Sequence, residues 1–420
     1  MDIGFSRIEL KRNERELTFY SQSIETLLTM SFFKNTGRVF HRELRRFAKG
    51  RAFSMLSIGL PLMATAYFFI LLDKGVATDI PIAVFDQDNS TLSRQAARMI
   101  DAAPAPKVAY YVSDMLEGER LMKEGKIDAV VHFPKHLERD ILSTKQVKVM
   151  AYINGANVTK NGLLDKDIRM TMYTFSSGVE IQTLIKKGFS EKQAYDLMMP
   201  VYLEKHVLFN PYINYGYYLL PLFLSMMLLI FILMSTIFTI GVELKNGTAG
   251  EWLETGGGDI FASYLGKILP YTLIFTILTL FIDTVMFQLL GVPMNGNKGM
   301  VLLSSLFFVM AYQSIGVLII GLLGNLRLGL SIGGGYSVLA FTFCGMTFPA
   351  MAMSPVIQTL GYLFPLTFHM NLFVNQAMRG APELWSLPDL LALLLFMILP
   401  LFVLPRLRRM CSDEKYWGKM

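Results

Sequence analysis

The sequence predicts a polytopic α-helical membrane protein with six transmembrane helices plus an extracytoplasmic α/β domain. The first observation is the spacing of its apolar segments: one at 52–72, then about 140 mostly polar residues, then a cluster from 214 to 405. The second is composition, because 53% of the 420 residues are hydrophobic and 17% are charged, against about 25% charged in soluble domains. Runs of about 18 apolar residues are long enough to cross the hydrocarbon core.

The expected spans lie at 52–72, 214–240, 267–290, 299–323, 328–350 and 388–405. Basic residues crowd the segment 38–51 before the first span, and Arg406, Arg408 and Arg409 follow the last. Six spans place both termini on one side, and the excess of Lys and Arg predicts that this side is cytoplasmic. The net charge of +6 is accounted for by these flanks, so it gives no reason to expect a nucleic-acid partner.

These assignments divide the chain into a cytoplasmic N-terminus (1–51), a first span, an outer α/β domain (73–213), a five-helix bundle (214–405) and a cytoplasmic tail (406–420). The bundle includes a cytoplasmic loop at 243–258 and an outer hairpin at 351–387. Of the two cysteines, Cys344 falls inside a span and Cys411 in the tail. The outer domain has none and is expected to fold without disulfides.

The segment before the first span has a helical pattern. Phe40, Leu44 and Phe47 recur at helical spacing, and Arg42 and Arg45 stand among them. This pattern predicts a basic amphipathic helix that lies at the membrane interface. The alternative is a charged flank whose only role is to set topology.

The outer domain alternates apolar, β-branched runs with capped helical runs. Strands are expected at 80–85, 108–112, 127–133 and 147–153, and helices at 91–102, 114–123, 134–142 and across 157–206. Alternation of this kind predicts a mostly parallel sheet. Asp86 and Asp88 are interpreted as turn and capping residues rather than as catalytic carboxylates.

The loop at 243–258 carries an expected short helix. Thr248 and Glu251 match a capping box, and three glycines from Gly256 end the helix. Trp252 and Leu253 are too bulky for so short a loop to bury in a core of its own. They are therefore expected to face the membrane, the bundle or a partner protein.

Asp283 is a carboxylate inside the third span. It costs roughly 2.5–3.5 kcal/mol at mid-membrane on insertion scales, so it is expected to face the bundle or a watery cavity. A role in the substrate pathway and a purely structural pairing both remain open.

Prolines interrupt the chain at the outer hairpin: Phe348 and Pro349 directly precede it, and Pro355 and Pro365 break it again. Broken helices at membrane depth must lie against protein or a cavity. A re-entrant or interfacial hairpin is therefore expected there.

Motifs for chemistry are missing from the sequence. Gly266-Lys267 resembles the end of a phosphate-binding loop, but Phe261 replaces the first glycine and Ile268 the hydroxyl residue. No metalloprotease, nucleophile-elbow or Cys-x-x-Cys motif occurs. The chain is therefore expected not to be an enzyme and to hold no cofactor or metal.

Four stretches together are similar to one family. They are Ile82–Ser90 with Leu92–Arg94, Asp128–Pro134 with Leu137–Asp140, the loop residues Glu243, Gly247, Thr248, Leu253 and Thr255, and the hairpin residues Gly345, Phe348-Pro349, Met353–Pro355 and Leu363–Thr367. The chain resembles the membrane subunit (permease) of a type-2 ABC exporter with a large periplasmic domain. One departure is Gly256–Gly258, where the family usually has a proline after its threonine.

The resemblance implies a multi-pass protein of the bacterial inner membrane. Its partners would be a cytoplasmic ABC ATPase that binds ATP and Mg, a second permease copy or a sister subunit, the lipid bilayer and, in some systems, a periplasmic adaptor. The exported substrate would be hydrophobic or amphiphilic, such as a drug or a lipid. The helix at 38–51 would contact the ATPase, and the loop would couple to it through Glu243, Gly247, Thr248, Glu251, Trp252, Leu253 and Thr255.

Two other classes of protein compete with this interpretation. A membrane-anchored sensor would use the outer domain to bind a ligand, but it would not need so many packed spans. A gradient-driven transporter would carry inverted repeats and more intramembrane charge than Asp283.

Overall fold

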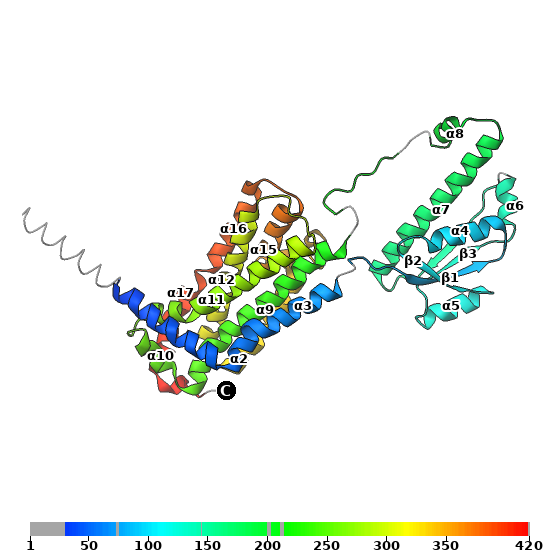
Figure 1. Cartoon of the computed structure of the whole chain (residues 1–420). Coiled ribbons are helices and arrows are strands. Elements are labelled where there is room, and N and C mark those ends of the chain that lie inside the picture. The colour runs from blue at the N-terminus through cyan, green and yellow to red at the C-terminus, as the bar shows by residue number, and fades with distance from the viewer. Residues whose placement is uncertain (1–29, 73–74, 144, 200–202, 211–213, 419–420) are drawn as a thin grey trace, which may run out of the picture. The chain divides into compact units, whose positions relative to one another are not determined.

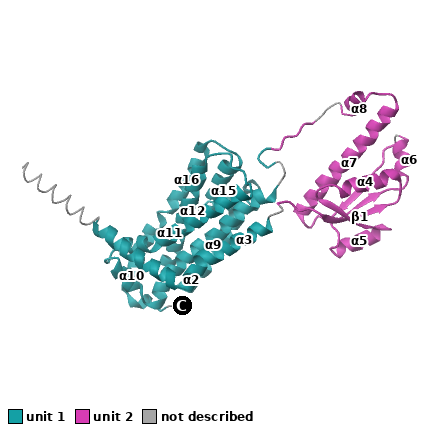
Figure 2. Ribbon diagram, viewed as in Figure 1, with its two compact units in different colours: residues 1–73, 208–420 teal, residues 74–207 magenta. Residues whose placement is uncertain are grey.

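The computed structural model describes residues 30–72, 75–143, 145–199, 203–210 and 214–418. The chain forms two compact units (Figure 2). We call Met1–Asp73 with Leu208–Met420 the membrane unit and Lys74–Val207 the α/β unit. Most of the expected N-terminal segment, residues 1–29, lies outside the described residues.

The membrane unit is helical throughout (Figure 1). Residues 30–49 form an N-terminal helix, and a continuous helix follows through α2 (Arg51–Ser54), η1 (Met55–Gly59) and α3 (Leu60–Leu71). The remaining elements are α9 (Tyr215–Asn246), α10 (Ala249–Thr255), α11 (Ile260–Thr284), η2 (Val285–Leu289), α12 (Lys298–Leu323), α13 (Leu326–Phe343), η3 (Ala350–Ala352), α14 (Pro355–Gly361), α15 (Pro365–Phe373), η4 (Val374–Met378), α16 (Glu383–Phe396), α17 (Leu399–Ser412) and η5 (Glu414–Tyr416).

The prediction of six spans is confirmed. Among the described residues, six helical stretches are long and apolar enough to cross a membrane, and they begin at Arg51, Tyr215, Ile260, Lys298, Leu326 and Glu383. The bounds differ where polar residues continue a helix. The third stretch begins seven residues before the predicted 267, because the Asp259 side chain caps it by accepting the Phe261 N–H at 2.8 Å.

Small residues let the central helices approach closely. A Cβ added to Gly316 of α12 would lie 2.8 Å from the Cβ of Thr236 in α9. One added to Gly333 of α13 would lie 2.7 Å from the Cδ1 of Ile237. Close backbone approach at glycine is a common basis of helix packing in membranes, and it places α9 in contact with both α12 and α13.

The α/β unit is built on a four-stranded sheet in the order β2-β1-β3-β4. The strands are β1 (Ile80–Asp86), β2 (Pro106–Tyr111), β3 (Ala129–Phe133) and β4 (Met150–Ile153). β1 runs parallel to β2 and β3, and β4 runs antiparallel to β3, so the mostly parallel sheet was correctly predicted. The helices are α4 (Thr91–Asp101), α5 (Met115–Lys123), α6 (Leu137–Leu142), α7 (Val158–Lys186) and α8 (Glu191–Met198).

The two central strands, β1 and β3, are buried on both faces, whereas the edge strands β2 and β4 are mostly exposed. Ile82 and Val84 of β1 pack into the core shared with α4 and α7, while Ala83 and Phe85 join the core beneath α5. Several predicted elements were too long: β3 begins at 129 rather than 127, β4 at 150 rather than 147 and α6 at 137 rather than 134, and helix does not continue to 206. For α6 the cause is His136, whose φ of 66° lies in the left-handed region and stops the helix from starting earlier.

The turn after β1 is held as the sequence predicts. The Asp86 carboxylate accepts the N–H groups of Asp88 and Asn89, both at 3.0 Å. Asp88 accepts the N–H of Glu138 at 3.0 Å and so ties this turn to α6. These contacts account for both carboxylates as turn and capping groups.

Candidate functional site

The N-terminal helix packs on the bundle through one buried line of residues. Val39 and Glu43 are fully buried and lie one helical turn apart, and Phe47 continues the line. Leu44 is 43% exposed and does not belong to this buried line, so its expected place on a membrane-facing apolar side stays a prediction. Phe40 is partly buried, as is Arg42, whereas Arg45 is exposed. The buried side of this helix thus contains the carboxylate of Glu43, which the sequence pattern did not identify.

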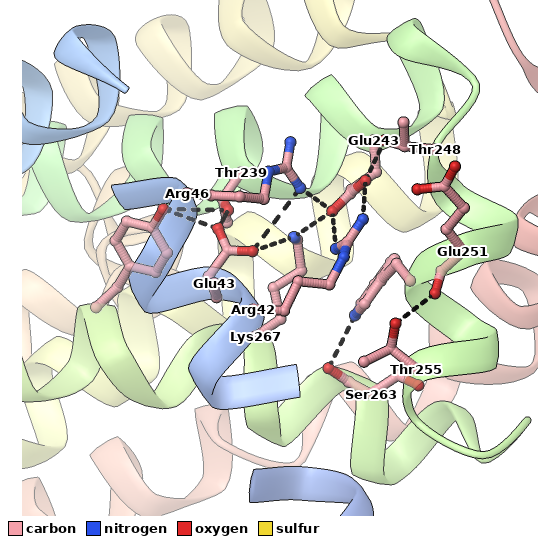
Figure 3. Close-up of polar contacts among 12 residues, drawn as sticks. Arg42, Glu43, Arg46, Thr239, Glu243, Thr248, Glu251, Thr255, Ser263 and Lys267 are labelled. Carbon is pink, nitrogen blue, oxygen red and sulfur yellow. Dashed lines mark hydrogen bonds and ion pairs between the residues drawn. The ribbon is translucent and has the colours of Figure 1, made fainter. Parts of the chain in front are cut away.

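Glu43 is the first of two buried carboxylates joined by Lys267 of α11 (Figure 3). The Lys267 Nζ donates to Glu43 Oε2 at 2.6 Å and to Glu243 Oε1 at 2.8 Å. All three side chains are fully buried. Tyr271 and Thr239 donate their hydroxyls to Glu43 Oε1 at 3.0 and 2.6 Å. In the sequence Lys267 stands at the start of the predicted third span, and in the structure it is an internal bridge between two carboxylates.

Glu243, near the end of α9, gathers donors from three elements. Arg42 donates to both of its oxygens, at 2.6 and 3.2 Å, which is the bidentate geometry favoured by guanidinium groups. Arg46 and the hydroxyl of Thr248 also donate to Glu243. We call Arg42, Glu43, Arg46, Glu243 and Lys267 the charge network. It joins the N-terminal helix, α9 and α11.

The network balances its charges within a buried space. Three cations face two anions, and the two arginine side chains keep 21% and 24% exposure for the surplus charge. Burial tends to raise the pKa of Glu43, but Lys267, Thr239 and Arg46 together hold this pKa below its ordinary value of 4.5. Removing one partner from such a cluster costs about 3–5 kcal/mol, because a buried charge is left uncompensated.

α10 seats its bulky residues in the bundle. Trp252 is fully buried and donates its indole N–H to the carbonyl of Ser263 at 3.1 Å. The Lys267 ammonium lies 5.0 Å from the centre of the Trp252 ring, within cation–π range. Leu253 is 8% exposed. Trp252 and Leu253 were expected to face the membrane, the bundle or a partner protein, and the structure places both against the bundle.

The predicted capping box of α10 is wrong. Thr248 occupies the N-cap position, but its side chain makes no capping bond and turns to Glu243 instead. Glu251 is exposed and free of that role. The Thr248 hydroxyl donates to the buried Glu243 carboxylate, because a buried acceptor needs hydrogen-bond partners. The helix itself begins where expected.

Glycines set the bounds of α10. Gly247 ends α9 with φ of 72°, a conformation that residues with a Cβ rarely adopt. Gly257 and Gly258 follow Thr255 with φ of 69° and 76°, as the helix stop at 256–258 requires. The outward face between these stops carries Glu251 and Glu254, both exposed.

The C-terminal segment packs on the same loop, which the sequence did not predict. Cys411, expected in a tail, is fully buried within α17. Trp417 donates its indole N–H to Met410 at 3.0 Å, and a Cβ added to Gly250 of α10 would lie 3.2 Å from the Trp417 ring. The N–H of Gly418 donates to Leu244 at 3.1 Å. The adjacent aromatics Tyr416 and Trp417 were the signal in the sequence that could have indicated this packing.

A basic groove of about 940 Å³ follows the N-terminal helix and reaches Thr255 of α10. Its basic lining is Lys34, Arg38, His41, Arg42, Arg45, Arg46 and Lys49. Arg38, Arg45 and Lys49 form no ion pair with any residue that the structure describes. The groove therefore presents uncompensated positive charge beside the acidic outward face of α10.

Asp283, the candidate pathway residue, lies near the other end of α11. It is partly buried and accepts a hydrogen bond from the hydroxyl of Ser305 at 3.1 Å. It also lines a cavity of about 310 Å³ together with Gln288 and Lys298. The carboxylate thus faces the bundle and a cavity, as expected from its cost in lipid.

The outer hairpin is a chain of short helices broken at its prolines. Pro349 precedes η3, and Pro355 and Pro365 each begin a helix at its first position. Phe348 is 53% exposed. α15 is the buried part, where His369 hydrogen-bonds Ser304 at 2.8 Å.

Within the described ranges, no group of three or more His, Cys, Asp or Glu side chains could hold a metal ion. The charge network and Asp283 both lie in the membrane unit, among six described helical stretches long and apolar enough to span a bilayer. They define a multi-pass membrane protein whose buried charges tie helices together.

The comparison with protein families agrees with this class. Residues 51–404 match the model of the ABC-2 family transporter proteins, and the chain belongs to that family. It is therefore a transmembrane permease subunit with no catalytic role of its own, as its resemblance implied. No curated protein sequence matches the chain. The N-terminal helix that supplies three of the five network residues lies outside the matched range.

Proposed function

We propose that this chain is one half of an ATP-driven exporter of hydrophobic or amphiphilic substrates in a bacterial inner membrane. A second copy or a sister subunit completes the pathway, and a separate cytoplasmic ATPase binds ATP and Mg. Both chain termini then lie in the cytoplasm. The basic residues beside the spans support this orientation, and the family supports the class of transporter.

We propose further that the ATPase contacts the outward face of α10 and the basic groove. One observation carries this: α10 seats Trp252 in the bundle and leaves Glu251 and Glu254 exposed beside uncompensated cations. This revises the coupling set. Glu251, Thr255 and Arg45 are surface contacts in the proposal, while Glu243, Thr248, Trp252, Leu253 and Arg42 form the frame beneath them.

The frame gives the contact a mechanical consequence. A displacement of α10 is passed to α11 through the hydrogen bond between Trp252 and Ser263. It is passed to the N-terminal helix through Thr248, Glu243 and Arg42. The three elements then move as one body. ATP drives export only if the ATPase dimer with ATP bound prefers one arrangement of this body, because a ligand shifts a population by its differential affinity alone.

Charge reversal tests the proposed contact. In the variant carrying Glu251→Lys and Glu254→Lys, copurification of the proposed partner ABC ATPase should fall about tenfold or more, since two favourable charge contacts become repulsive. The protein should still fold, because both side chains are exposed. The measurement is the ratio of ATPase to permease recovered in mild detergent.

A matched control in the α/β unit carries Glu119→Lys on α5 and Glu124→Lys at the C-cap of that helix. These exposed carboxylates form only surface ion pairs, which contribute little to stability. The control should recover the ATPase as wild type does. Equal recovery by both double variants would reject α10 as the contact, and recovery of no Walker-type ATPase with the wild-type protein would reject the exporter itself.

A further inference from the structure

The α/β unit contains a groove that the permease assignment does not use. Its volume is about 460 Å³, and it runs between α6, the segment 145–149 and the second half of α7. Sites for small molecules commonly enclose about 300–1,000 Å³. All of its lining lies within one compact unit, so its shape does not depend on the membrane unit.

The floor of the groove is apolar. Leu137 and Phe175 belong to the buried core of the unit and are 0% and 5% exposed. Five further apolar side chains pack on that core and stay only partly buried while they line the groove: Ile141, Val147, Val149, Met172 and Val179. An apolar surface of this kind with a polar rim is typical of a ligand site.

The groove remains open because the sheet ends beside it. β4 begins only at Met150, so residues 145–149 make no strand pairing. α7 continues to Lys186 and places Val179 and Leu184 along this unpaired segment. The strand predicted at 147–153 is therefore shorter in the structure, and Val147 and Val149 line the groove instead.

The rim carries charge without partners. Lys145, Lys187 and Glu180 line the groove, and none of them forms an ion pair with another described residue. Two cations against one anion leave a net positive rim. Gln146, Ser176 and Thr183 add polar groups.

We propose that this groove binds a long-chain amphiphile with an anionic headgroup, its chain on the apolar floor and its head at Lys145 and Lys187. The assignment follows from charge complementarity and from the size of the apolar floor. It rests on the proposed export function and deepens it, because it names the substrate class that the α/β unit would receive.

The test uses the full-length protein in nanodiscs of zwitterionic lipid. The probe is palmitic acid carrying a diazirine in its chain, and cross-linked peptides are located by mass spectrometry. Label is expected on peptides from 137–149 and 172–187. A second probe, an anionic phospholipid with the same diazirine in one chain, distinguishes a free fatty acid from a phospholipid as the source of the headgroup. Only the probe that fits the groove should label these peptides.

Two variants probe the two halves of the site. Val179→Trp fills the floor and should lower labelling about tenfold. Lys145→Glu with Lys187→Glu reverses the rim and should lower labelling to a similar extent, while raising that of a matched probe with a trimethylammonium head. The second variant alters exposed side chains and keeps the test decisive if the first fails to fold.

The control pair is Lys166→Glu with Lys192→Glu, which lie outside the groove on α7 and α8 and should label as wild type does. Wild-type labelling by both acid and ammonium probes alike would overturn the proposal. Variants that leave labelling unchanged would also overturn it. Variants that change only the oligomeric state would overturn it as well, because they would identify the groove as a protein interface. Copurification of the ATPase is measured on the same variants, so failure of the groove is distinct from failure of the exporter.

Discussion

α11 carries an ionisable group near each end, and the two groups are treated in opposite ways. Lys267, near the start, is met by two carboxylates from two other helices. Asp283, sixteen residues and about 24 Å further along the helix, has one hydroxyl partner and borders a cavity. A group held by several charged partners is fixed in place, whereas a group with one neutral partner beside a cavity is held less firmly. The comparison therefore contrasts a strongly bound charge at one end of α11 with a weakly bound one at the other.

The largest test of this difference is Lys267→Met. The variant leaves Glu43 and Glu243 buried without their shared ammonium, and we expect it to lower the free energy of unfolding by about 3–5 kcal/mol. The buried thiols of Cys344 and Cys411 provide the readout, because a thiol-reactive dye reaches them only on unfolding. The unfolding temperature should fall markedly.

Lys245→Met is the matched control, since Lys245 is exposed on the same side of the bundle. Its unfolding temperature should stay within a degree or two of the wild type, as expected for a surface change of under about 0.5 kcal/mol. Equal curves for the two variants would mean that the charge network does not hold the helices together.

Acid should weaken the same end of α11 by a smaller amount. The pKa of Glu43 lies below its ordinary value of 4.5 in the folded protein, since Lys267, Thr239 and Arg46 outweigh the opposing effect of burial. Its contribution to stability is therefore fully present above pH 4.5 and is lost as the pH falls through the lowered folded pKa. Unfolding temperatures measured by intrinsic fluorescence should fall below pH 4.5.

Glu43→Gln tests the source of that acid sensitivity. This variant should be less stable than wild type at pH 7 and should lose part of the decline below pH 4.5. A decline of the same size in both proteins would assign it to other carboxylates.

Sequence patterns predicted the spans and the sheet, because each depends on runs of apolar residues with a regular period. They could not pair Glu43 with Lys267, since the two lie 224 positions apart and each alone resembles an ordinary flanking charge. Trp252 shows the same limit. Its bulk indicated that it would be buried, but only the fold shows that it packs in the bundle and that Glu251 and Glu254 stay exposed.

Asp283→Asn is the smallest expected change in stability and the sharpest test of the second half of the comparison. Asparagine keeps an oxygen that can accept the Ser305 hydrogen bond, and it removes a carboxylate that has no cationic partner in the described contacts. We therefore expect the free energy of unfolding to change by less than about 1 kcal/mol. If the carboxylate serves the pathway, substrate export in reconstituted vesicles should fall while ATPase binding stays unchanged. A loss of stability as large as that of Lys267→Met would show that both ends of α11 are fixed in the same way, and unchanged export with unchanged stability would remove Asp283 from the pathway.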